Sequence, residues 1–483
     1  MRSELYLDGR WRAGAGATFT SENPATGETL WSGAGASGSD VADACAAARA
    51  AFPAWSRAQL EDRITIVRTF AQAVEQRAAA FAETIARETG KAHWDSKGEV
   101  ATVVGKVEIS IRALAERAGH RSESAPFGAM TLEHRPHGVM AVFGPFNFPA
   151  HLPNGHIVPA LLAGNTIVFK PSELTPGAGA LMIECWEAAN LPAGVINLVQ
   201  GARETGEALT SNDEINGVLF TGSVGVGQTI HRHFAGRPDI VLALEMGGNN
   251  PLIAWGPADV DAAANIIAQS AFVTSGQRCS CARRLVVPDD AWGAGVVDAL
   301  AAFAGKISIG AWNAEPEPFM GPLVRKRAGE NAERFVEMLA THGGKPVVPL
   351  FRDGAFVHPA IFDMTGARAI EDEELFGPVL QVFRVATFDD AIARANATRF
   401  GLSGGLISDD AELWARAHAE MRCGVLNWNR PTTGASGAMP FGGPGLSGSA
   451  RPSAYYAADY CAYPVATQKA EKAVAIPAPG LPK

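Results

Sequence analysis

The stretch Val218-Leu219-Phe220-Thr221-Gly222-Ser223-Val224-Gly225-Val226-Gly227 joins a short apolar run to a glycine-rich turn, and a helical pattern follows to about Phe234. A strand that enters a helix through such a turn lets the backbone approach a pyrophosphate, because the amides at the helix N-terminus favour an anion. The glycines are spaced G-x-x-G-x-G instead of the common G-x-G-x-x-G. By itself the motif is therefore as compatible with a simple tight turn as with a nucleotide site.

The sequence around this stretch alternates short apolar runs with helical patterns. Five runs predict the strands of a first sheet: residues 139–143, 166–169, 196–199, 218–220 and 240–244. A second series comprises residues 251–255, 284–287, 379–385, 404–407 and 424–427. Such alternation is typical of parallel sheets that are covered by helices on both faces. The predicted fold class is α/β, with two domains of this kind.

The N-terminal part precedes these strands. Leu5-Tyr6-Leu7, Asp8-Gly9 and Arg10-Trp11 predict a hairpin. A helix is expected over residues 41–52, ended by Pro53, and a second, longer helix from Ile64 to near Gly90. At the other end, the Ala/Pro-rich tail after Ala466 is expected to fray.

Composition limits the classes of function. With 483 residues the chain is long enough for two or three domains. Its net charge of −9 gives no electrostatic footprint for nucleic acid or an anionic membrane surface. No apolar run is long enough for a membrane span, and the N-terminus has no signal sequence. The six cysteines are sparse and unpatterned, so free thiols in the cytoplasm are expected.

A second cofactor signal follows the run at residues 166–169. Lys170-Pro171-Ser172-Glu173 comes directly after it. A carboxylate just past a strand end can accept hydrogen bonds from a ribose diol and repel a 2′-phosphate. Glu173 therefore favours NAD over NADP, although Lys170 and Glu173 alone are also typical of a solvated turn.

The candidate nucleophile is Cys279, which lies in a loop of small residues between Thr274 and Cys281. The neighbouring guanidinium of Arg278 is expected to lower the pKa of this thiol. For any single cysteine a buried, inert thiol is the simpler interpretation. The pair Cys279-x-Cys281 is too short and isolated for a zinc site, and no metal is expected.

Two further turns supply the context for Cys279. Glu245, followed by two glycines, ends an apolar run, and small neighbours leave room for a water that a carboxylate could activate. Asn147 follows the run at residues 139–143 and offers an amide donor to a developing oxyanion. Since ligands of open α/β sheets bind at the carboxyl ends of strands, these three residues are predicted to form one site.

A competing motif is Gly401-Leu402-Ser403-Gly404-Gly405, which matches the G-x-S-x-G nucleophile elbow of hydrolases. That elbow needs a strand before the serine and a helix after it. Here the preceding residues 390–398 are helical in pattern and an apolar run follows, so the match is interpreted as a coincidence. His151 and His156 are spaced neither as zinc ligands nor as triad members, and they are expected to line a pocket or to make ordinary polar contacts.

Taken together, these segments resemble the NAD(P)-dependent aldehyde dehydrogenase superfamily over essentially the whole chain. The matching stretches are residues 143–149, 169–173, 220–227, 245–251, 276–279, 374–378 and 440–448. The resemblance implies a Rossmann-type NAD-binding domain (residues 1–118 and 137–246), a catalytic domain (247–449) and a β-flap oligomerisation element (119–136 and 450–468), with a tail at 469–483. Such a flap implies a homodimer or homotetramer.

The resemblance also implies roles for individual residues. Cys279 would attack the aldehyde, Asn147 and the Cys279 amide would hold the oxyanion, and Glu245 would activate water. The residues expected to bind NAD are Lys170, Glu173, Gly222, Ser223, Gly225, Gly227, Glu374 and Phe376.

Four stretches indicate a particular group within this superfamily: residues 151–156, 276–284, 427–429 and 451–461. They are similar to the members that oxidise N-succinylglutamate 5-semialdehyde in arginine catabolism by the succinyltransferase route. This dianionic substrate would need cationic or amide donors, for which Arg278, Ser280, Gly434 and Ser436 are candidates. For Arg278, an ion pair that shapes the loop is an equally good interpretation. Another carboxylated semialdehyde, such as glutamate semialdehyde, is the alternative substrate, and a thiol hydrolase that uses no NAD is the alternative class.

Overall fold

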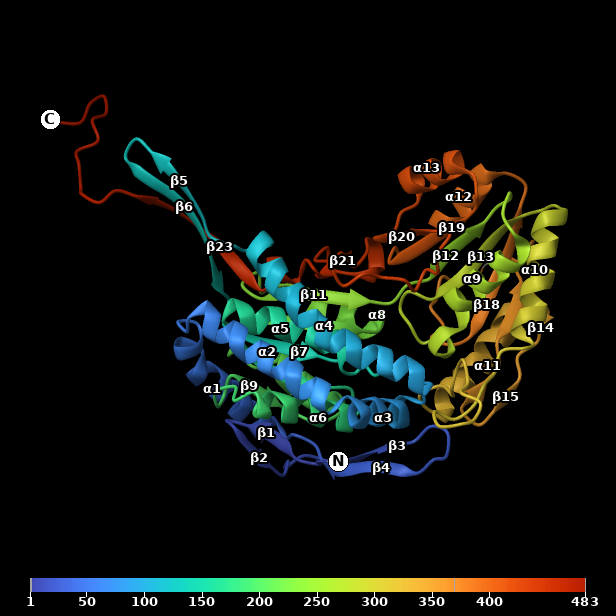
Figure 1. The fold of residues 1–483 in the computed structure, drawn as a ribbon, viewed down its shortest axis with the longest axis horizontal. Coiled ribbons are helices and arrows are strands. Elements are labelled where there is room, and N and C mark those ends of the chain that lie inside the picture. Colours follow the sequence, from blue (N-terminus) through green and yellow to red (C-terminus); the bar gives the residue numbers. More distant parts are fainter. Residues whose placement is uncertain (1, 369, 483) are drawn as a thin grey trace.

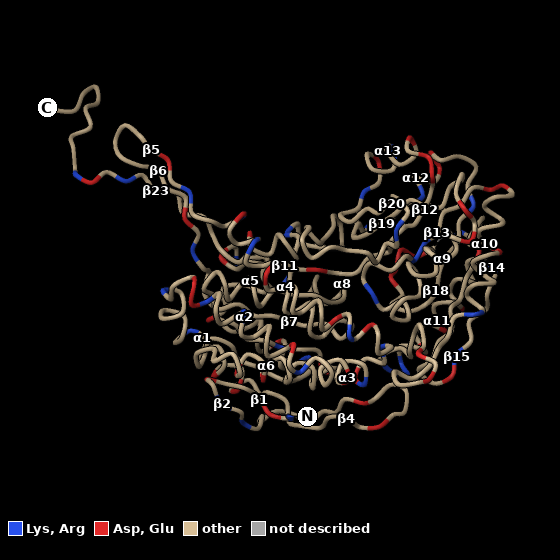
Figure 2. Tube along the Cα trace, viewed as in Figure 1, with Lys and Arg blue, Asp and Glu red and all other residues tan. Residues whose placement is uncertain are grey.

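The computed structural model describes residues 2–368 and 370–482. Two α/β domains lie side by side, and a narrow β-flap projects away from the first of them (Figure 1). Along the chain trace, Lys and Arg positions are interspersed with Asp and Glu positions in both domains (Figure 2). None of the helices in the described residues combines the length and the apolar character needed to cross a bilayer.

The first domain is built on a seven-stranded sheet in the order β11-β10-β7-β8-β9-β1-β2. Its strands are β1 (Leu5–Leu7), β2 (Arg10–Arg12), β7 (Val139–Phe143), β8 (Thr166–Lys170), β9 (Ile196–Leu198), β10 (Ile215–Gly222) and β11 (Val241–Met246). The five strands from β7 to β11 are parallel, and the hairpin β1–β2 joins antiparallel beside β9. The predicted hairpin and all five predicted strands are confirmed.

Helices cover both faces of this sheet. They are α1 (Gly38–Trp55), α2 (Leu60–Gln76), α3 (Ala78–Thr89), α4 (His93–Arg117), α5 (His151–Ala163), α6 (Pro176–Ala188), α7 (Arg203–Thr210) and α8 (Val224–His233). Side chains alternate along a strand, so β7 sends Met140 and Val142 to one core and Val139, Ala141 and Phe143 to the other. This is why an all-apolar run marks a strand that is buried on both faces.

Two expectations for the N-terminal helices were wrong, and one helix was not predicted. Pro53 lies inside the last turn of α1, which ends at Trp55; its ring removes one N–H donor there, and the helix continues for only two more residues. The single helix predicted up to Gly90 is two helices separated at Arg77, and Gly90 ends the second in the left-handed region at φ 78°. Helix α4 was not predicted, because its buried face mixes valines with charged and hydroxyl side chains, which weakens the apolar pattern.

The second domain contains a sheet in the order β14-β17-β18-β13-β12-β19-β20. Its strands are β12 (Asn250–Ala254), β13 (Ala282–Pro288), β14 (Lys345–Val348), β17 (Ala360–Asp363), β18 (Val379–Val385), β19 (Ser403–Ile407) and β20 (Val425–Trp428). Its helices are α9 (Val260–Phe272), α10 (Ala291–Ala304), α11 (Lys326–Thr341), α12 (Phe388–Asn396) and α13 (Ala411–Glu420). The second series of predicted strands is confirmed, and β14 and β17 extend it.

The flap is a three-stranded sheet of β5 (Arg121–Ala125), β6 (Gly128–Pro136) and β23 (Ala462–Lys469). Strand β23 pairs with β6 out to Lys469, so the tail is ordered three residues beyond the expected fraying point at Ala466. The preceding helix α14 (Ala457–Tyr460) packs against α4 and α5 of the first domain. Of residues 450–468, therefore, only those from Ala462 onward take part in the flap sheet.

The remaining elements are short. They are β3 (Thr18–Glu22), β4 (Thr29–Ala34), β15 (Arg352–Asp353), β16 (Phe356–Val357), β21 (Pro440–Phe441), β22 (Ser453–Ala454) and the 3₁₀ turns Val273–Gly276 and Gly445–Ser447.

Candidate active site

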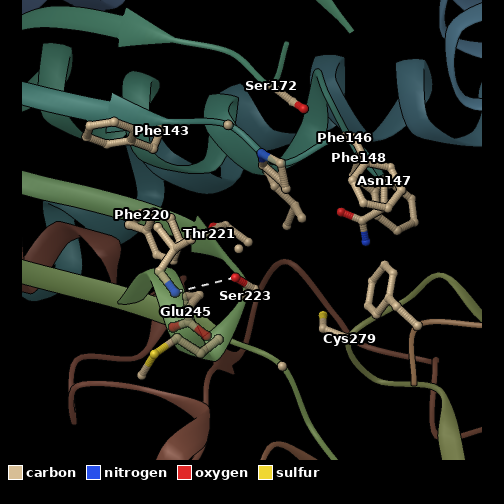
Figure 3. A pocket seen from close by; sticks show the side chains of 18 of the residues that line it. Phe143, Phe146, Asn147, Phe148, Ser172, Phe220, Thr221, Ser223, Glu245 and Cys279 are labelled. Atoms are coloured by element: carbon tan, nitrogen blue, oxygen red, sulfur yellow. Dashed lines mark hydrogen bonds between the residues drawn. The ribbon is translucent and has the colours of Figure 1, made fainter. Parts of the chain in front are cut away.

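A cavity of about 1680 Å³ is lined by residues of both domains. It lies at the carboxyl ends of β7, β8, β10 and β11, where ligands of open parallel sheets bind. Cys279, Glu245 and Asn147 all line it. In Figure 3 the sulfur of Cys279 and the amide of Asn147 face the same part of the cavity, while Glu245 lies at the end of its strand across from them. The predicted convergence of the three residues is thus present.

The loop that carries Cys279 follows α9 through a strained 3₁₀ turn. Thr274 and Ser275 have φ values of 54° and 56°, and Gly276 has φ 71°. A Cβ at Gly276 would overlap the carbonyl of Gly377, so only glycine fits there. Asn250 Nδ2 then donates to the carbonyl oxygen of Cys279 at 2.7 Å. The backbone of the nucleophile is therefore held by packing from several segments.

The thiol of Cys279 is not activated by Arg278, and this expectation was wrong. Burial, followed by the negative charges of Glu374 and Glu245, raises the pKa of Cys279 to about 12, and Arg283 opposes this only partly. The Arg278 guanidinium is turned to Asp95, with a 2.8 Å ion pair. The surroundings of the thiol therefore favour its protonated form over the thiolate.

Glu245 is buried at the end of β11, with 5% of its surface exposed. One carboxylate oxygen accepts a hydrogen bond from the Ser453 amide at 3.2 Å, and the other has no partner among the described residues. Burial raises the pKa of Glu245 well above its ordinary value. A carboxylate that binds a proton more strongly than usual, with a free oxygen in a cavity, is suited to general-base chemistry.

Asn147 follows β7 and donates one N–H of its amide to the Gln277 carbonyl oxygen at 2.9 Å. Gln277 is itself anchored, since its side-chain oxygen accepts from the Val324 amide at 3.0 Å. The contact orients the Asn147 amide and leaves its second N–H available. Such a pre-oriented donor beside a nucleophile is the requirement for stabilising an oxyanion.

The residues of the glycine-rich turn have different structural roles, which the motif alone does not indicate. The Ser223 hydroxyl caps α8 by accepting from the Val226 amide at 3.5 Å. Gly225 lines the cavity, and a Cβ there would meet nothing within 4 Å. A Cβ at Gly227 would overlap the Met246 sulfur, and Gly227 is absent from the cavity lining. The cavity is thus lined by Gly222, Ser223 and Gly225, three of the residues expected to bind the cofactor. Gly227 is instead needed so that α8 can pack against β11.

Lys170 and Glu173 both line the cavity after β8. Lys170 is buried, and its ammonium donates to the carbonyl oxygens of Pro171 and Gly201 at 2.9 and 2.7 Å. Burial lowers the pKa of Lys170 to about 8, against the opposing charge of Glu173.

Glu374 and Phe376 reach the cavity from the second domain. Glu374 lies 3.5 Å from the buried Arg283 guanidinium, and burial raises the pKa of Glu374 to about 7. The ring of Phe376 meets that of Phe146 edge-on, with centroids 5.8 Å apart. Both of these residues, which were expected to bind NAD, therefore lie in the same cavity as Cys279.

The candidate substrate residues divide into two groups. Ser280 and Ser436 line the cavity, as does Arg278 despite its ion pair. Gly434 is absent from the cavity lining, and its carbonyl oxygen accepts from Asn427 Nδ2 at 3.0 Å. The structure thus places Gly434 outside the cavity lining, although its neighbours Thr433 and Ala435 belong to it.

The alternatives weighed from sequence have ordinary structural explanations. Ser403 begins β19 after helix α12, and its hydroxyl donates to the Thr432 carbonyl at 2.9 Å, so no nucleophile elbow is present at this serine. His156 bonds to Tyr460 at 2.8 Å and to Thr221 at 3.3 Å. His151 lines the cavity. Within residues 2–368 and 370–482, no group of three or more His, Cys, Asp or Glu side chains is placed to hold a metal ion.

Sequence reasoning missed several residues of this site. They are Ser453, Asn250, Arg283 and Asp95. Each forms a hydrogen bond or an ion pair with a residue that is distant in the sequence, and nothing in its local sequence indicates that contact.

Comparison with known proteins places this site in a family. The model of the "Aldehyde dehydrogenase family" matches residues 11–464. N-succinylglutamate 5-semialdehyde dehydrogenase 2 of Caulobacter vibrioides is 58% identical over 481 residues, covering 98% of each chain. The N-succinylglutamate 5-semialdehyde dehydrogenase of Chromobacterium violaceum is 53% identical, covering 99% of this chain and 98% of the relative.

Solved structures with a similar fold support the same family. An NADP-dependent glyceraldehyde-3-phosphate dehydrogenase of Bacillus halodurans, complexed with NADP, has a TM-score of 0.90 at 25% identity, covering 97% of this chain and 99% of that one. A protein of Sinorhizobium meliloti named as a methylmalonate-semialdehyde dehydrogenase, complexed with NAD, has a TM-score of 0.91 at 26% identity, covering 97% and 98%. The nucleophile, base and oxyanion donor thus occur in a chain that matches the family almost end to end. The chain belongs to the aldehyde dehydrogenase family.

Proposed function

We propose that this enzyme oxidises N-succinyl-L-glutamate 5-semialdehyde to N-succinyl-L-glutamate with NAD, in the cytoplasm, as a step of arginine catabolism. The observation that carries the proposal is the identity of 53–58% over 98–99% of the chain to relatives that bear this name. Cys279, Glu245 and Asn147 in one cavity supply the chemistry that the reaction needs.

In the proposed mechanism, Cys279 Sγ attacks the aldehyde carbon and its proton leaves to solvent. The oxyanion of the resulting thiohemiacetal accepts hydrogen bonds from Asn147 Nδ2 and the Cys279 amide. A bound NAD would supply the hydride acceptor for that carbon, so that Cys279 would then carry a thioester. Glu245 then takes a proton from water, and the hydroxide displaces the thiolate to release the acid. The overall balance is aldehyde, NAD⁺ and water to carboxylate, NADH and two protons.

The residues present fit a dinucleotide. Gly225 leaves open space at the start of α8, where the helix dipole and free amides favour a pyrophosphate. Glu173 reaches the same cavity from the end of β8, where a ribose would be recognised. Glu374 and Phe376 would hold the nicotinamide end.

Glu173 is expected to set the preference for NAD. Glu173→Gln should raise kcat/KM with NADP by about tenfold or more relative to NAD, because removal of one like charge near a 2′-phosphate recovers about 1–2 kcal/mol. Initial rates with each cofactor check this, with Glu207→Gln, also on the cavity rim, as the matched control. Equal use of NAD and NADP by the unaltered enzyme would contradict the role of Glu173.

The substrate is tested by NADH formation with N-succinylglutamate semialdehyde, glutamate semialdehyde and an aliphatic aldehyde. A strong preference for the succinylated substrate is expected. Preference for glutamate semialdehyde would favour the alternative, and failure of all three would favour a thiol hydrolase that uses no NAD.

We further propose that the NAD-binding and catalytic domains follow the expected boundaries, and that the flap of β5, β6 and β23 pairs in a homodimer or homotetramer. The flap carries large exposed apolar side chains: Phe127, Met130 and Tyr463 are 47%, 42% and 42% exposed. Apolar surface gathered on a projecting sheet is typical of an interface. Met130→Glu combined with Tyr463→Glu should therefore reduce the particle mass measured by light scattering. An unchanged mass would exclude the flap as the interface.

A further inference from the structure

The first domain contains a buried lysine that the mechanism does not use. Three lysines of the described residues are buried: Lys91, Lys106 and Lys170. Lys91 forms an ion pair with Glu99 at 2.6 Å, and Lys170 donates to two carbonyl oxygens. For Lys106, which is 2% exposed, the described residues provide neither an ion pair nor a hydrogen bond.

A buried ammonium group without a partner is unfavourable, because it has lost its hydration and gained nothing in return. Burial lowers the pKa of Lys106 to about 8. At neutral pH the side chain is therefore still largely protonated. A charge of this kind is expected to be neutralised by something that binds, since proteins rarely bury an unpaired cation.

Lys106 faces the cavity that contains Cys279. It projects from the middle of α4 toward α5 and toward the loop after Ser436. Its Cε lies 3.7 Å from the position a Cβ would take at Gly155, and its Nζ lies 3.9 Å from that position at Gly437. Both neighbours lack side chains, so space remains around the ammonium. The residues proposed to bind the cofactor come from other elements: the ends of β8 and β10, and the segment of the second domain with Glu374 and Phe376.

The nearby acids are already engaged. Glu99, on the same helix, pairs with Lys91 and accepts from the amides of Ala150 and His151. Asp95 pairs with Arg278. Burial, with the charge of Lys106 adding to it, lowers the pKa of His151 to about 3, so this ring is neutral. Lys106 therefore leaves this wall of the cavity with an uncompensated positive charge.

We propose that Lys106 binds a carboxylate of the semialdehyde substrate and selects carboxylated substrates over neutral aldehydes. The identity of the substrate in this inference rests on the proposed function. N-succinylglutamate semialdehyde has an α-carboxylate and a succinyl carboxylate, and an ammonium forms a strong charge-assisted hydrogen bond with either. Ser436, which lines the cavity next to Gly437, offers a hydroxyl as a second donor.

The test compares Lys106→Met with Lys97→Met, an exposed lysine of the same helix. Kinetics are measured with four aldehydes: N-succinylglutamate semialdehyde, N-acetylglutamate semialdehyde, N-succinyl-4-aminobutanal and hexanal. Lys106→Met should lower kcat/KM for the first by about 100-fold, mainly through KM, as when one partner of a buried charge pair is removed. Hexanal should be unaffected, and Lys97→Met should match the unaltered enzyme throughout.

The two singly carboxylated aldehydes identify the group that Lys106 binds. N-acetylglutamate semialdehyde lacks the succinyl carboxylate, and N-succinyl-4-aminobutanal lacks the α-carboxylate. If Lys106→Met and the unaltered enzyme have the same kcat/KM for one of these two aldehydes, then Lys106 binds the carboxylate that this aldehyde lacks. An equal loss on all four aldehydes, or an unchanged KM for the succinylated one, would overturn the inference.

Two further measurements keep the result interpretable. The Kd for the product N-succinylglutamate, measured by calorimetry, should rise by a similar factor in Lys106→Met, and it reports binding even if turnover is lost. If the unaltered enzyme shows no preference for the succinylated substrate, the proposed function fails. Lys106 is then tested by comparing kcat/KM for glutamate semialdehyde with kcat/KM for hexanal. Loss of the preference for glutamate semialdehyde in Lys106→Met would support the inference, and a retained preference would refute it.

Discussion

Replacement of Cys279 by alanine is expected to abolish NADH formation from every aldehyde, with kcat/KM falling by about 10⁴-fold or more, as when a covalent nucleophile is removed. The thioester through which the reaction passes has no other sulfur to form on, because Cys281 is buried and is absent from the cavity lining. Stopped-flow and steady-state absorbance of NADH measure the loss in the first and in later turnovers.

Cys423→Ala is the matched control for this variant. Like Cys279, Cys423 is partly exposed, but it does not line the cavity. The control should keep full activity, and both variants should still bind NAD. NADH formation by Cys279→Ala at the rate of Cys423→Ala would show that another group carries the reaction.

Glu245→Gln is expected to allow one turnover and then stop. Hydride transfer precedes the step that needs Glu245, and removal of its charge also removes one of the causes that raise the pKa of Cys279. The first equivalent of NADH should therefore appear as a burst, while kcat falls by about 10²–10⁴-fold, the usual loss with a general base. Mass spectrometry should detect the acylated protein.

The pH dependence of deacylation follows from the same residue. Glu245 must be ionised to accept a proton, and burial raises its pKa well above the ordinary value. Deacylation should therefore increase as the pH rises through that raised pKa, and decrease as the pH falls below it. This rise should be absent in Glu245→Gln and retained in Glu373→Gln, which makes the same chemical change at the cavity rim. A full rate without a burst in Glu245→Gln would assign the base elsewhere.

The surroundings of the Cys279 thiol explain why the local sequence predicted its pKa wrongly. Arg278 is adjacent to Cys279 in the chain, which favours a lowered pKa. In the fold its guanidinium is paired with Asp95, whereas Glu374 and Glu245 are the charges that act on the sulfur. Adjacency in sequence does not determine adjacency of charge, because side-chain direction depends on packing.

The strands were the most predictable part of the fold. Residues 139–143 and 379–385 were predicted with the bounds that β7 and β18 have, since both runs are rich in the apolar and β-branched side chains that buried strands favour. The positions of Asn147 and Glu245 followed from the runs at residues 139–143 and 240–244, because the carboxyl ends of parallel strands share one edge. Helix α4 escaped prediction because its buried face includes Glu99, whose burial depends on Lys91 and on two backbone amides outside the helix.

The sequence by itself determined the α/β class, the order of the strands along the chain and the three residues that meet in the cavity, because local apolar patterns and turn chemistry specify them. Only the tertiary structure decided that the Ser453 amide bonds to Glu245 across 208 positions and that Asp95 takes Arg278 across 183. It likewise decided that Gly227 packs on Met246 and that Lys106 faces the cavity unpaired. Such contacts depend on the three-dimensional positions of several segments at once, and no periodicity within one segment encodes them.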